Sequence, residues 1–134
     1  MVTAVEKPQI SWLEKNPFIK HLGFEPVVEE RENVIAVKLF IDSNHLNIQQ
    51  NLHGGVHASM LDTIHTVVLR NVYQTSVSVQ NLNVHYLAGT STGEIIARAK
   101  IIQQGYKIAA VDSEIVDEHG TLIAKGSGVY KIKR

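Results

Sequence analysis

Two features between residues 47 and 66 have residue types that could catalyse a reaction. His53, Gly54 and Gly55 stand where a polar stretch changes to a pattern of helical spacing. Glycine lets backbone N–H groups approach a ligand, and the first turn of a helix leaves such groups unpaired at the positive end of the helix dipole. These groups could stabilise an oxyanion. The alternative is a glycine-rich start of a helix beside a solvated histidine.

The second feature is Asp62, which lies within the apolar pattern that follows the glycines. A buried carboxylate is costly unless it is paired or used in a reaction. Asp62 is therefore a candidate general base. The structural alternative is an aspartate bonded to Ser59, Thr66 or a backbone group.

The spacing of these residues predicts a site shared between subunits. His53 and Asp62 are nine positions apart, which places them on opposite sides of a helix at roughly 100° per residue. A symmetric partner could bring Asp62 of one subunit to the Gly54 amide of another. Asn47, in the preceding loop, has an amide that can orient water or a carbonyl, although asparagine is also a common turn residue.

The elements that must hold these residues follow from the periodicity of apolar positions. From residue 55 to 73, apolar residues recur at helical spacing on several sides, which indicates a long buried helix. Nearer the N-terminus, Ser11 is predicted to cap a helix over residues 12–21 that Pro17 splits or kinks and Gly23 ends.

Alternating apolar residues predict strands in the rest of the chain, the first two forming a hairpin around a turn at residues 31–33. The predicted strands cover residues 25–30, 34–40, 76–87, 94–103, 109–117 and 122–133. A long buried helix followed by antiparallel strands favours an α+β fold in which a curved sheet wraps around the helix.

Composition limits the classes of function. The 134 residues are expected to form one domain, residues 1–134, with 44% hydrophobic and 19% charged residues. Thirteen basic residues balance thirteen acidic ones, so no general attraction to nucleic acid or anionic membrane is expected. The absence of cysteine excludes disulfides, cysteine-ligated zinc and cysteine nucleophiles. Without an apolar signal core or a run of about 18 apolar residues, we expect a soluble, cytoplasmic protein.

The motif Asn47-x5-His53-Gly54-Gly55-x6-Asp62 resembles that of hot-dog-fold thioesterases of the phenylacetate-pathway (PaaI-like) type, a group that includes acyl-CoA thioesterases. The resemblance extends over most of the chain, including the LNVHYL stretch at residues 82–87. It implies a hot-dog fold and a homo-oligomer, either a dimer or a dimer of dimers (a homotetramer), with acyl-CoA bound at the subunit interface.

The same resemblance implies roles for individual residues in hydrolysis of an acyl-CoA to a carboxylic acid and CoA. Asp62 would activate water or attack the thioester, Asn47 would hold water or substrate, and the Gly54 N–H would polarise the carbonyl. His53 would mainly shape the loop. The residues predicted to contact substrate are Gly55, Met60, His65, Val79, Tyr106 and Lys107.

Several positions depart from the family pattern. Val79 stands where the family often has Ser or Thr, and Leu87-Ala88-Gly89 replaces a frequent Arg-Pro. Tyr106 and Lys107 replace a frequent Arg after the hairpin glycine, so Lys107 is the expected phosphate ligand and Tyr106 a candidate for stacking on adenine. His65 is unusual in this helix and is predicted either to tune Asp62 or to line the pocket.

Other functions have weaker support in the sequence. His53 and His57 have zinc-ligand spacing but lack the glutamate of zincins, and Asp62 with His65 more often makes a hydrogen bond than a metal site. No metal or cofactor is therefore expected. The alternatives left open are a non-catalytic acyl-CoA sensor and a hydratase or dehydratase of the same fold. The acyl group, and the choice between CoA and acyl-carrier protein, are also left open.

Overall fold

The computed structural model describes residues 2–5, 8–29 and 34–134. The elements are α1 (Ser11–Glu14), α2 (Pro17–Leu22), β1 (Glu25–Glu29), β2 (Val34–Phe40), a 3-10 turn η1 (Ser43–His45), α3 (Gly54–Tyr73), β3 (Val77–Tyr86), β4 (Glu94–Gln104), β5 (Ile108–Asp117) and β6 (Leu122–Ile132). The helix and the strands predicted from periodicity are thus present, with ends that differ by at most one residue. The predicted turn at residues 31–33 lies outside the described residues.

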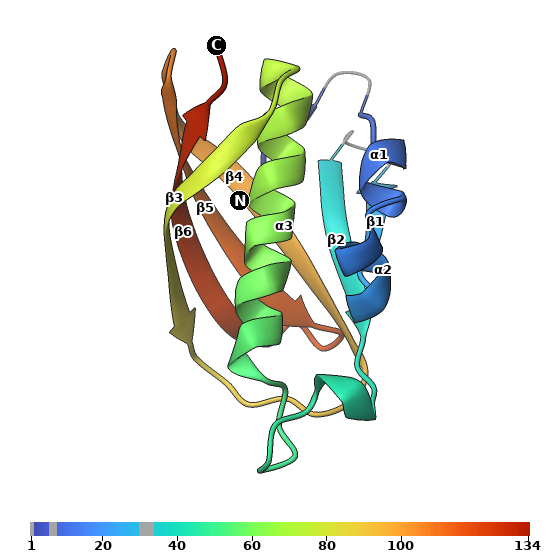
Figure 1. The fold of residues 1–134 in the computed structure, drawn as a ribbon. Helices are drawn as coiled ribbons and strands as arrows, with labels where there is room; N and C mark the ends of the chain where they lie inside the picture. The colour runs from blue at the N-terminus through green and yellow to red at the C-terminus, as the bar shows by residue number, and fades with distance from the viewer. Residues whose placement is uncertain (1, 6–7, 30–33) are drawn as a thin grey trace.

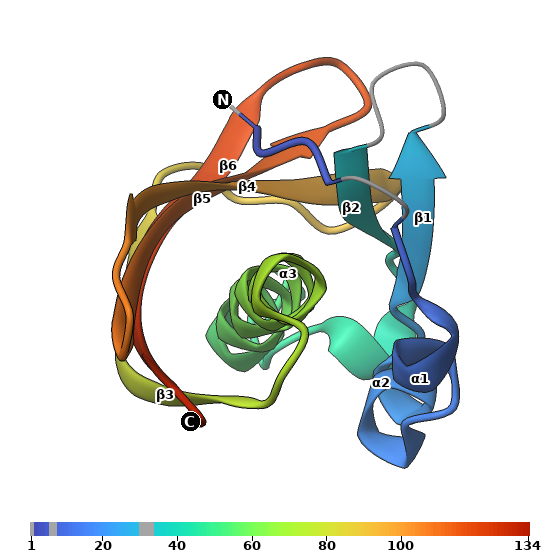
Figure 2. The ribbon, with the colours of Figure 1, turned by 90° about the horizontal axis from the view of Figure 1, so that it is seen from above.

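The six strands form one antiparallel sheet in the order β1-β2-β4-β5-β6-β3. The sheet curves strongly around α3, and α1 and α2 lie beside β1 (Figure 1). Seen along the helix, the sheet surrounds α3 and leaves one side open, between β3 and the two short helices (Figure 2). This arrangement confirms the predicted hot-dog fold.

Helix α3 is buried on most of its circumference, as its sequence predicts. Eleven of its 20 residues are buried, and it contacts β2, β3, β4, β5 and β6. It begins at Gly54, one residue earlier than the apolar pattern indicates, because His53 is extended and caps it. The central helix therefore brings the His-Gly-Gly segment to one end of the molecule and Asp62 to its middle.

The N-terminal helix is divided as Pro17 predicts, but its cap is different. The prediction that Ser11 caps it is wrong: Ser11 is the first helical residue, and no side chain in the described part of the protein caps α1. The second piece starts instead at Asn16, whose Oδ1 accepts the Phe18 N–H at 3.0 Å and the Ile19 N–H at 3.3 Å. Proline at the first helical position needs no N–H partner, so Asn16 can cap α2.

Strand β3 forms one edge of the sheet, and among the described residues it pairs only with β6. Its side chains are exposed or half-buried along the whole strand, unlike those of β5, where alternate residues are buried. A long edge strand that is exposed on both faces is a site for pairing with another chain. In the described part of the chain, no helix is long and apolar enough to cross a membrane.

Candidate active site

The loop before α3 is held in shape by the side chain of Asn47. Its Oδ1 accepts hydrogen bonds from the N–H groups of Gln49 at 2.9 Å and Asn51 at 3.1 Å. Because two N–H donors point at this atom, it must be the carboxamide oxygen and not the nitrogen. The Asn47 NH₂ group is therefore the part left to donate to a ligand.

The first turn of α3 has one capped and one free backbone donor. His53 Nδ1 accepts the Gly55 N–H at 2.8 Å, so His53 shapes the start of the helix as expected. Among the residues that the structure describes, none accepts a hydrogen bond from the Gly54 N–H. This free N–H, at the positive end of a 20-residue helix, is suited to polarise a carbonyl oxygen.

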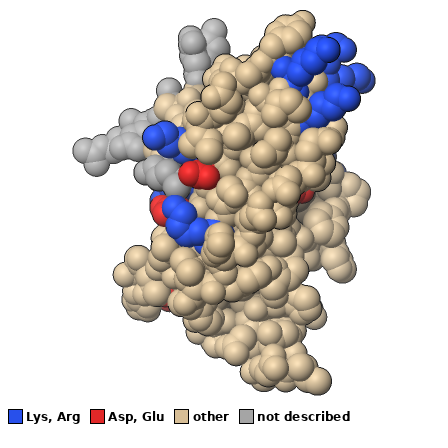
Figure 3. All heavy atoms as spheres, turned by 90° about the vertical axis from the view of Figure 1, so that its left-hand side faces the viewer, with Lys and Arg blue, Asp and Glu red and all other residues tan. Residues whose placement is uncertain are grey.

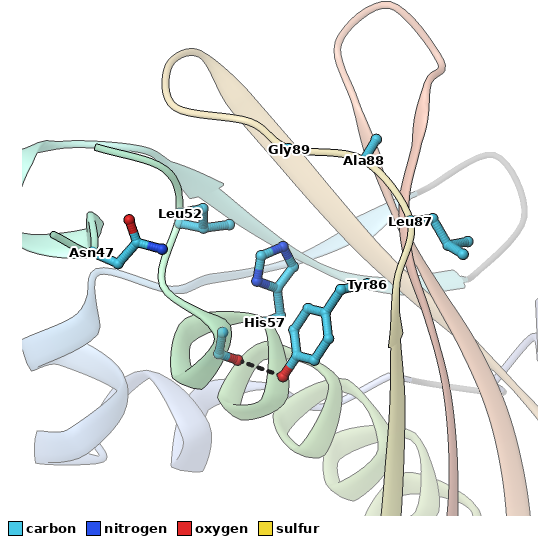
Figure 4. A pocket seen from close by; sticks show the side chains of 8 residues that line it. Asn47, Leu52, His57, Tyr86, Leu87, Ala88 and Gly89 are labelled. Atoms are coloured by element: carbon cyan, nitrogen blue, oxygen red, sulfur yellow. Dashed lines mark hydrogen bonds between the residues drawn. The ribbon is translucent and has the colours of Figure 1, made fainter. Parts of the chain in front are cut away.

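A cavity of about 440 Å³ opens beside this turn (Figure 4). It is lined by Asn47, Leu52, Gly54, His57, Tyr86, Leu87, Ala88 and Gly89. The Tyr86 hydroxyl donates to the Gly54 carbonyl at 3.0 Å, and its ring lies edge-on to the His57 ring with 5.1 Å between centroids. The cavity therefore combines a mainly apolar wall with a few polar groups, which is typical of a site for a small molecule.

His57 is a residue that the sequence analysis considered only as half of a metal pair. Its Nδ1 lies 3.2 Å from the His53 carbonyl, which can only accept, so Nδ1 carries the proton. Its Nε2 is buried and has no partner among the described residues. Burial lowers the pKa of His57, so this nitrogen is an unprotonated acceptor in a residue that lines the cavity. The feature of the sequence that pointed to His57 was its spacing of four residues from His53.

A metal site of the kind considered in the sequence has no support. His53 Nδ1 and His57 Nδ1 both make hydrogen bonds within the helix start. Within residues 2–5, 8–29 and 34–134, no group of three His, Asp or Glu side chains is placed to hold a metal ion.

Asp62 lies two turns further along α3 and faces a different cleft. It is half-buried, and the cleft of about 340 Å³ runs between α3 and the two N-terminal helices. The Tyr130 hydroxyl donates to Asp62 Oδ1 at 2.7 Å. Burial, together with the neighbouring Asp62, raises the pKa of Tyr130, so this hydroxyl stays protonated and acts as a donor.

A single chain does not bring Asp62 together with the Gly54 N–H. Eight residues at 1.5 Å per residue separate them by about 12 Å along the helix axis, and the cleft at Asp62 and the cavity at Gly54 share no lining residue. The two candidate groups thus lie in separate hollows of one subunit.

The predicted substrate contacts are scattered. Met60 and His65 are fully buried in the core, which places their side chains away from both hollows. Gly55 is exposed at the helix start, and Val79 is exposed on the edge strand β3.

Tyr106 and Lys107 are exposed on the β4–β5 turn, which lies at the far end of α3 from Gly54. The Tyr73 hydroxyl donates to the Gly105 carbonyl at 2.6 Å and fixes this turn against the last residues of the helix. The Arg134 guanidinium lies over the Tyr106 ring, 4.1 Å from its centroid.

Lysines from the end of β6 join this turn. Lys131 is paired with Ile108, and the Ile132 N–H donates to the Lys107 carbonyl at 2.7 Å. We call Lys107, Lys131, Lys133 and Arg134 the basic cluster; all four are exposed. Figure 3 shows Lys and Arg atoms gathered at this end of the sheet's outer face. Such a cluster is suited to bind phosphate groups.

Comparisons with known proteins agree on one family. The family model described as "Thioesterase superfamily" matches residues 49–124. Acyl-coenzyme A thioesterase 13 of Mus musculus is 29% identical over 113 residues, which cover 78% of this chain and 81% of that protein. Its Homo sapiens counterpart is 27% identical over 112 residues, covering 81% and 80%.

Solved structures share the fold. A thioesterase from Haemophilus influenzae superposes with a TM-score of 0.88 at 22% identity, covering 98% of this chain and 96% of that one. The E. coli PaaI protein from the phenylacetic acid degradation operon gives a TM-score of 0.82 at 20% identity, covering 92% and 89%. These matches confirm the resemblance seen in the sequence.

Proposed function

Because this chain belongs to the thioesterase superfamily, we propose that it hydrolyses acyl-CoA thioesters to a carboxylic acid and CoA. Water adds to the thioester carbonyl, the C–S bond breaks, and the CoA thiolate takes up a proton. The observation that carries this proposal is the free Gly54 N–H at the start of α3, beside a cavity of about 440 Å³.

In this mechanism the Gly54 N–H binds the carbonyl oxygen. The oxygen becomes negative as water adds, so a donor at the positive end of a helix stabilises the transition state more than the substrate. Loss of one such donor typically reduces turnover on the order of 10²–10³-fold. The Asn47 NH₂ group, on the same cavity, is the candidate to hold the water or the carbonyl.

Asp62 supplies the carboxylate, either as the base that takes a proton from water or as the nucleophile. Since Asp62 and Gly54 lie on different faces of one subunit, Asp62 would reach the carbonyl from a partner subunit. The exposed edge of β3 supports pairing with a second copy, giving a dimer or a dimer of dimers. His53 acts through the loop and helix start that it caps.

The CoA moiety would lie toward the basic cluster. Strand β3 runs from the C-terminal end of α3 back toward its N-terminal end (Figure 1). Two β3 edges paired antiparallel would therefore place the basic cluster of one subunit at the end where its partner holds Gly54. Lys107 would bind phosphate, and the exposed ring of Tyr106, the preceding residue, would stack on the adenine. Val79 and the apolar cavity wall are the candidates to contact the acyl group.

The proposal is tested by thiol release from a panel of aromatic, short, medium and long acyl-CoAs, with wild type beside Asp62→Asn. We expect turnover in wild type that collapses in Asp62→Asn, and the panel names the acyl group. The same panel on acyl-carrier protein separates the two carriers. Tight binding without turnover would instead identify a sensor, and full turnover in Asp62→Asn would contradict the role of Asp62.

A further inference from the structure

Four polar side chains form a continuous row from the core to Asp62. Ser113 Oγ lies 2.5 Å from His65 Nε2, and His65 Nδ1 lies 3.0 Å from the Tyr130 hydroxyl. That hydroxyl lies 2.7 Å from Asp62 Oδ1. Ser113, His65 and Tyr130 are all 0% exposed, so each contact is made away from water.

The direction of each hydrogen bond follows from the end of the row. An ionised carboxylate can only accept, so the single Tyr130 proton points to Asp62. The Tyr130 oxygen must then accept from His65 Nδ1–H. Burial lowers the pKa of His65 to about 4, so the ring carries one proton near neutral pH and its Nε2 is an acceptor. Ser113 therefore donates to Nε2. Every hydrogen bond in the row is thus donated in the direction of Asp62.

The residues packed around this row of hydrogen bonds leave its four side chains little freedom to move. A side chain at Gly128 would meet the Tyr130 ring at 2.7 Å and His65 Nδ1 at 2.9 Å. At Gly126 it would meet Ser113 Oγ at 2.9 Å. The His65 and Tyr130 rings also lie edge to face, 5.6 Å apart. Two close-packed glycines of β6 thus make the space in which the rings are held.

We propose that Tyr130, oriented by His65 and Ser113, is the positioning residue for Asp62. This row of hydrogen bonds holds Oδ1 in place and leaves Oδ2 for the attacking water or the thioester carbon. Within the described residues, no other side chain donates to Asp62. This inference rests on the proposed thioesterase function, because it assigns a helper to the carboxylate of that reaction.

The kinetic test uses Tyr130→Phe, which keeps the ring and removes the hydroxyl. We expect kcat to fall about 10- to 100-fold, the range for loss of a hydrogen bond to a charged group, with KM little changed. The acid limb of the kcat/KM profile should move to higher pH, because the ionised carboxylate has lost a donor. Ser113→Ala, at the other end of the row, should move the acid limb of the profile in the same direction by a smaller amount.

A loss of stability alone must not imitate this result. Ile95→Val removes one methylene from the core at a fully buried position that is not part of the hydrogen-bonded row. It should lower thermal stability while the pH profile of kcat/KM stays unchanged. A folded Tyr130→Phe with wild-type kcat and an unmoved acid limb would overturn the proposal.

A second readout needs no substrate. Nitrogen-15 NMR of the imidazole should find His65 as the neutral Nδ1–H tautomer in wild type and as Nε2–H in Tyr130→Phe, where only Ser113 remains as partner. An Nε2–H tautomer in wild type would contradict the proposed direction of the hydrogen bonds between Ser113 and Asp62. If no acyl-CoA is turned over, the proposed function fails. The NMR result still decides whether the hydrogen bonds of the row are donated toward Asp62.

Discussion

The Tyr86 hydroxyl hydrogen bonds to the carbonyl of Gly54 at 3.0 Å, and its ring covers the glycine at the start of α3. A Cβ added at position 54 would lie 3.3 Å from the Tyr86 oxygen and 3.4 Å from the ring carbon that bears it. These contacts are tight, so even alanine would have to displace the ring or the loop. A neighbour within the cavity therefore favours glycine at position 54, in addition to the proposed approach of a ligand.

This contact makes a graded prediction for turnover. Gly54→Ala should lower kcat modestly, and Gly54→Val should lower it on the order of 10²-fold or more, because the free N–H is moved from its position. Thiol release, with circular dichroism as the check on folding, measures both. Adding Tyr86→Phe removes the atom at 3.3 Å, so Gly54→Ala in that background should lose less than in wild type. Full activity in Gly54→Val would argue against the oxyanion role.

The divided site predicts complementation between two inactive variants. In a heterodimer of Asp62→Ala and Gly54→Val subunits, one site carries both changes and the other carries neither. After free exchange at equal amounts, half of the dimers are mixed, so about a quarter of the wild-type rate should return. The measurement is thiol release before and after exchange, with mass spectrometry to confirm mixing. No recovery in confirmed heterodimers would mean that each subunit has its own complete site.

Periodicity was sufficient to predict α3 and the strands because each has a repeating apolar pattern. It did not place Met60, which the sequence analysis predicted near the substrate. Helix α3 is contacted by five strands, so an apolar residue on most sides of it meets protein. The pattern shows that such a helix is buried but not which side faces a ligand.

The chain of polar residues behind Asp62 depends on contacts that are distant in sequence. His65 is 65 positions from Tyr130 and 48 from Ser113. Their meeting requires the register between β5 and β6, where Ser113 is opposite Gly126, and the packing of α3 on both strands. The sequence indicated that His65 was unusual and would either tune Asp62 or line the pocket, but it did not indicate Tyr130 or Ser113 as partners. By contrast, the separation of His53 and Asp62 depends on spacing within one helix, and it was predictable.

The basic cluster predicts a change in substrate binding without a change in chemistry. Lys107→Gln should raise KM for acyl-CoA about two- to fivefold with kcat unchanged, because one exposed charge near the phosphates is lost. The effect should shrink at high salt. The same acyl group on N-acetylcysteamine, which has no phosphate, should be hydrolysed equally by both proteins. Lys100→Gln removes an exposed charge on β4 outside the cluster and is the matched control.

Buried His65 predicts how stability depends on pH. Its pKa is about 4 in the folded protein, against 6.5 for the free side chain, so between these values the unfolded state binds more protons. The stability that depends on neutral His65 is therefore fully present above about pH 6.5 and is lost as pH falls toward 4. From pH 7.5 to pH 5, this one group should lower the free energy of unfolding by roughly 2 kcal/mol.

Urea unfolding of wild type and His65→Gln at the two pH values measures this difference directly. Glutamine does not titrate, so the variant should lose less stability on acidification, even if it is less stable at pH 7.5. The pKa of His57 is also lowered by burial and contributes with the same sign, so His57→Gln is measured in parallel to separate the two. An equal loss in wild type and His65→Gln would show that His65 is protonated without unfolding. The row of hydrogen bonds that ends on Asp62 would then have to tolerate a charged His65 imidazole in the core.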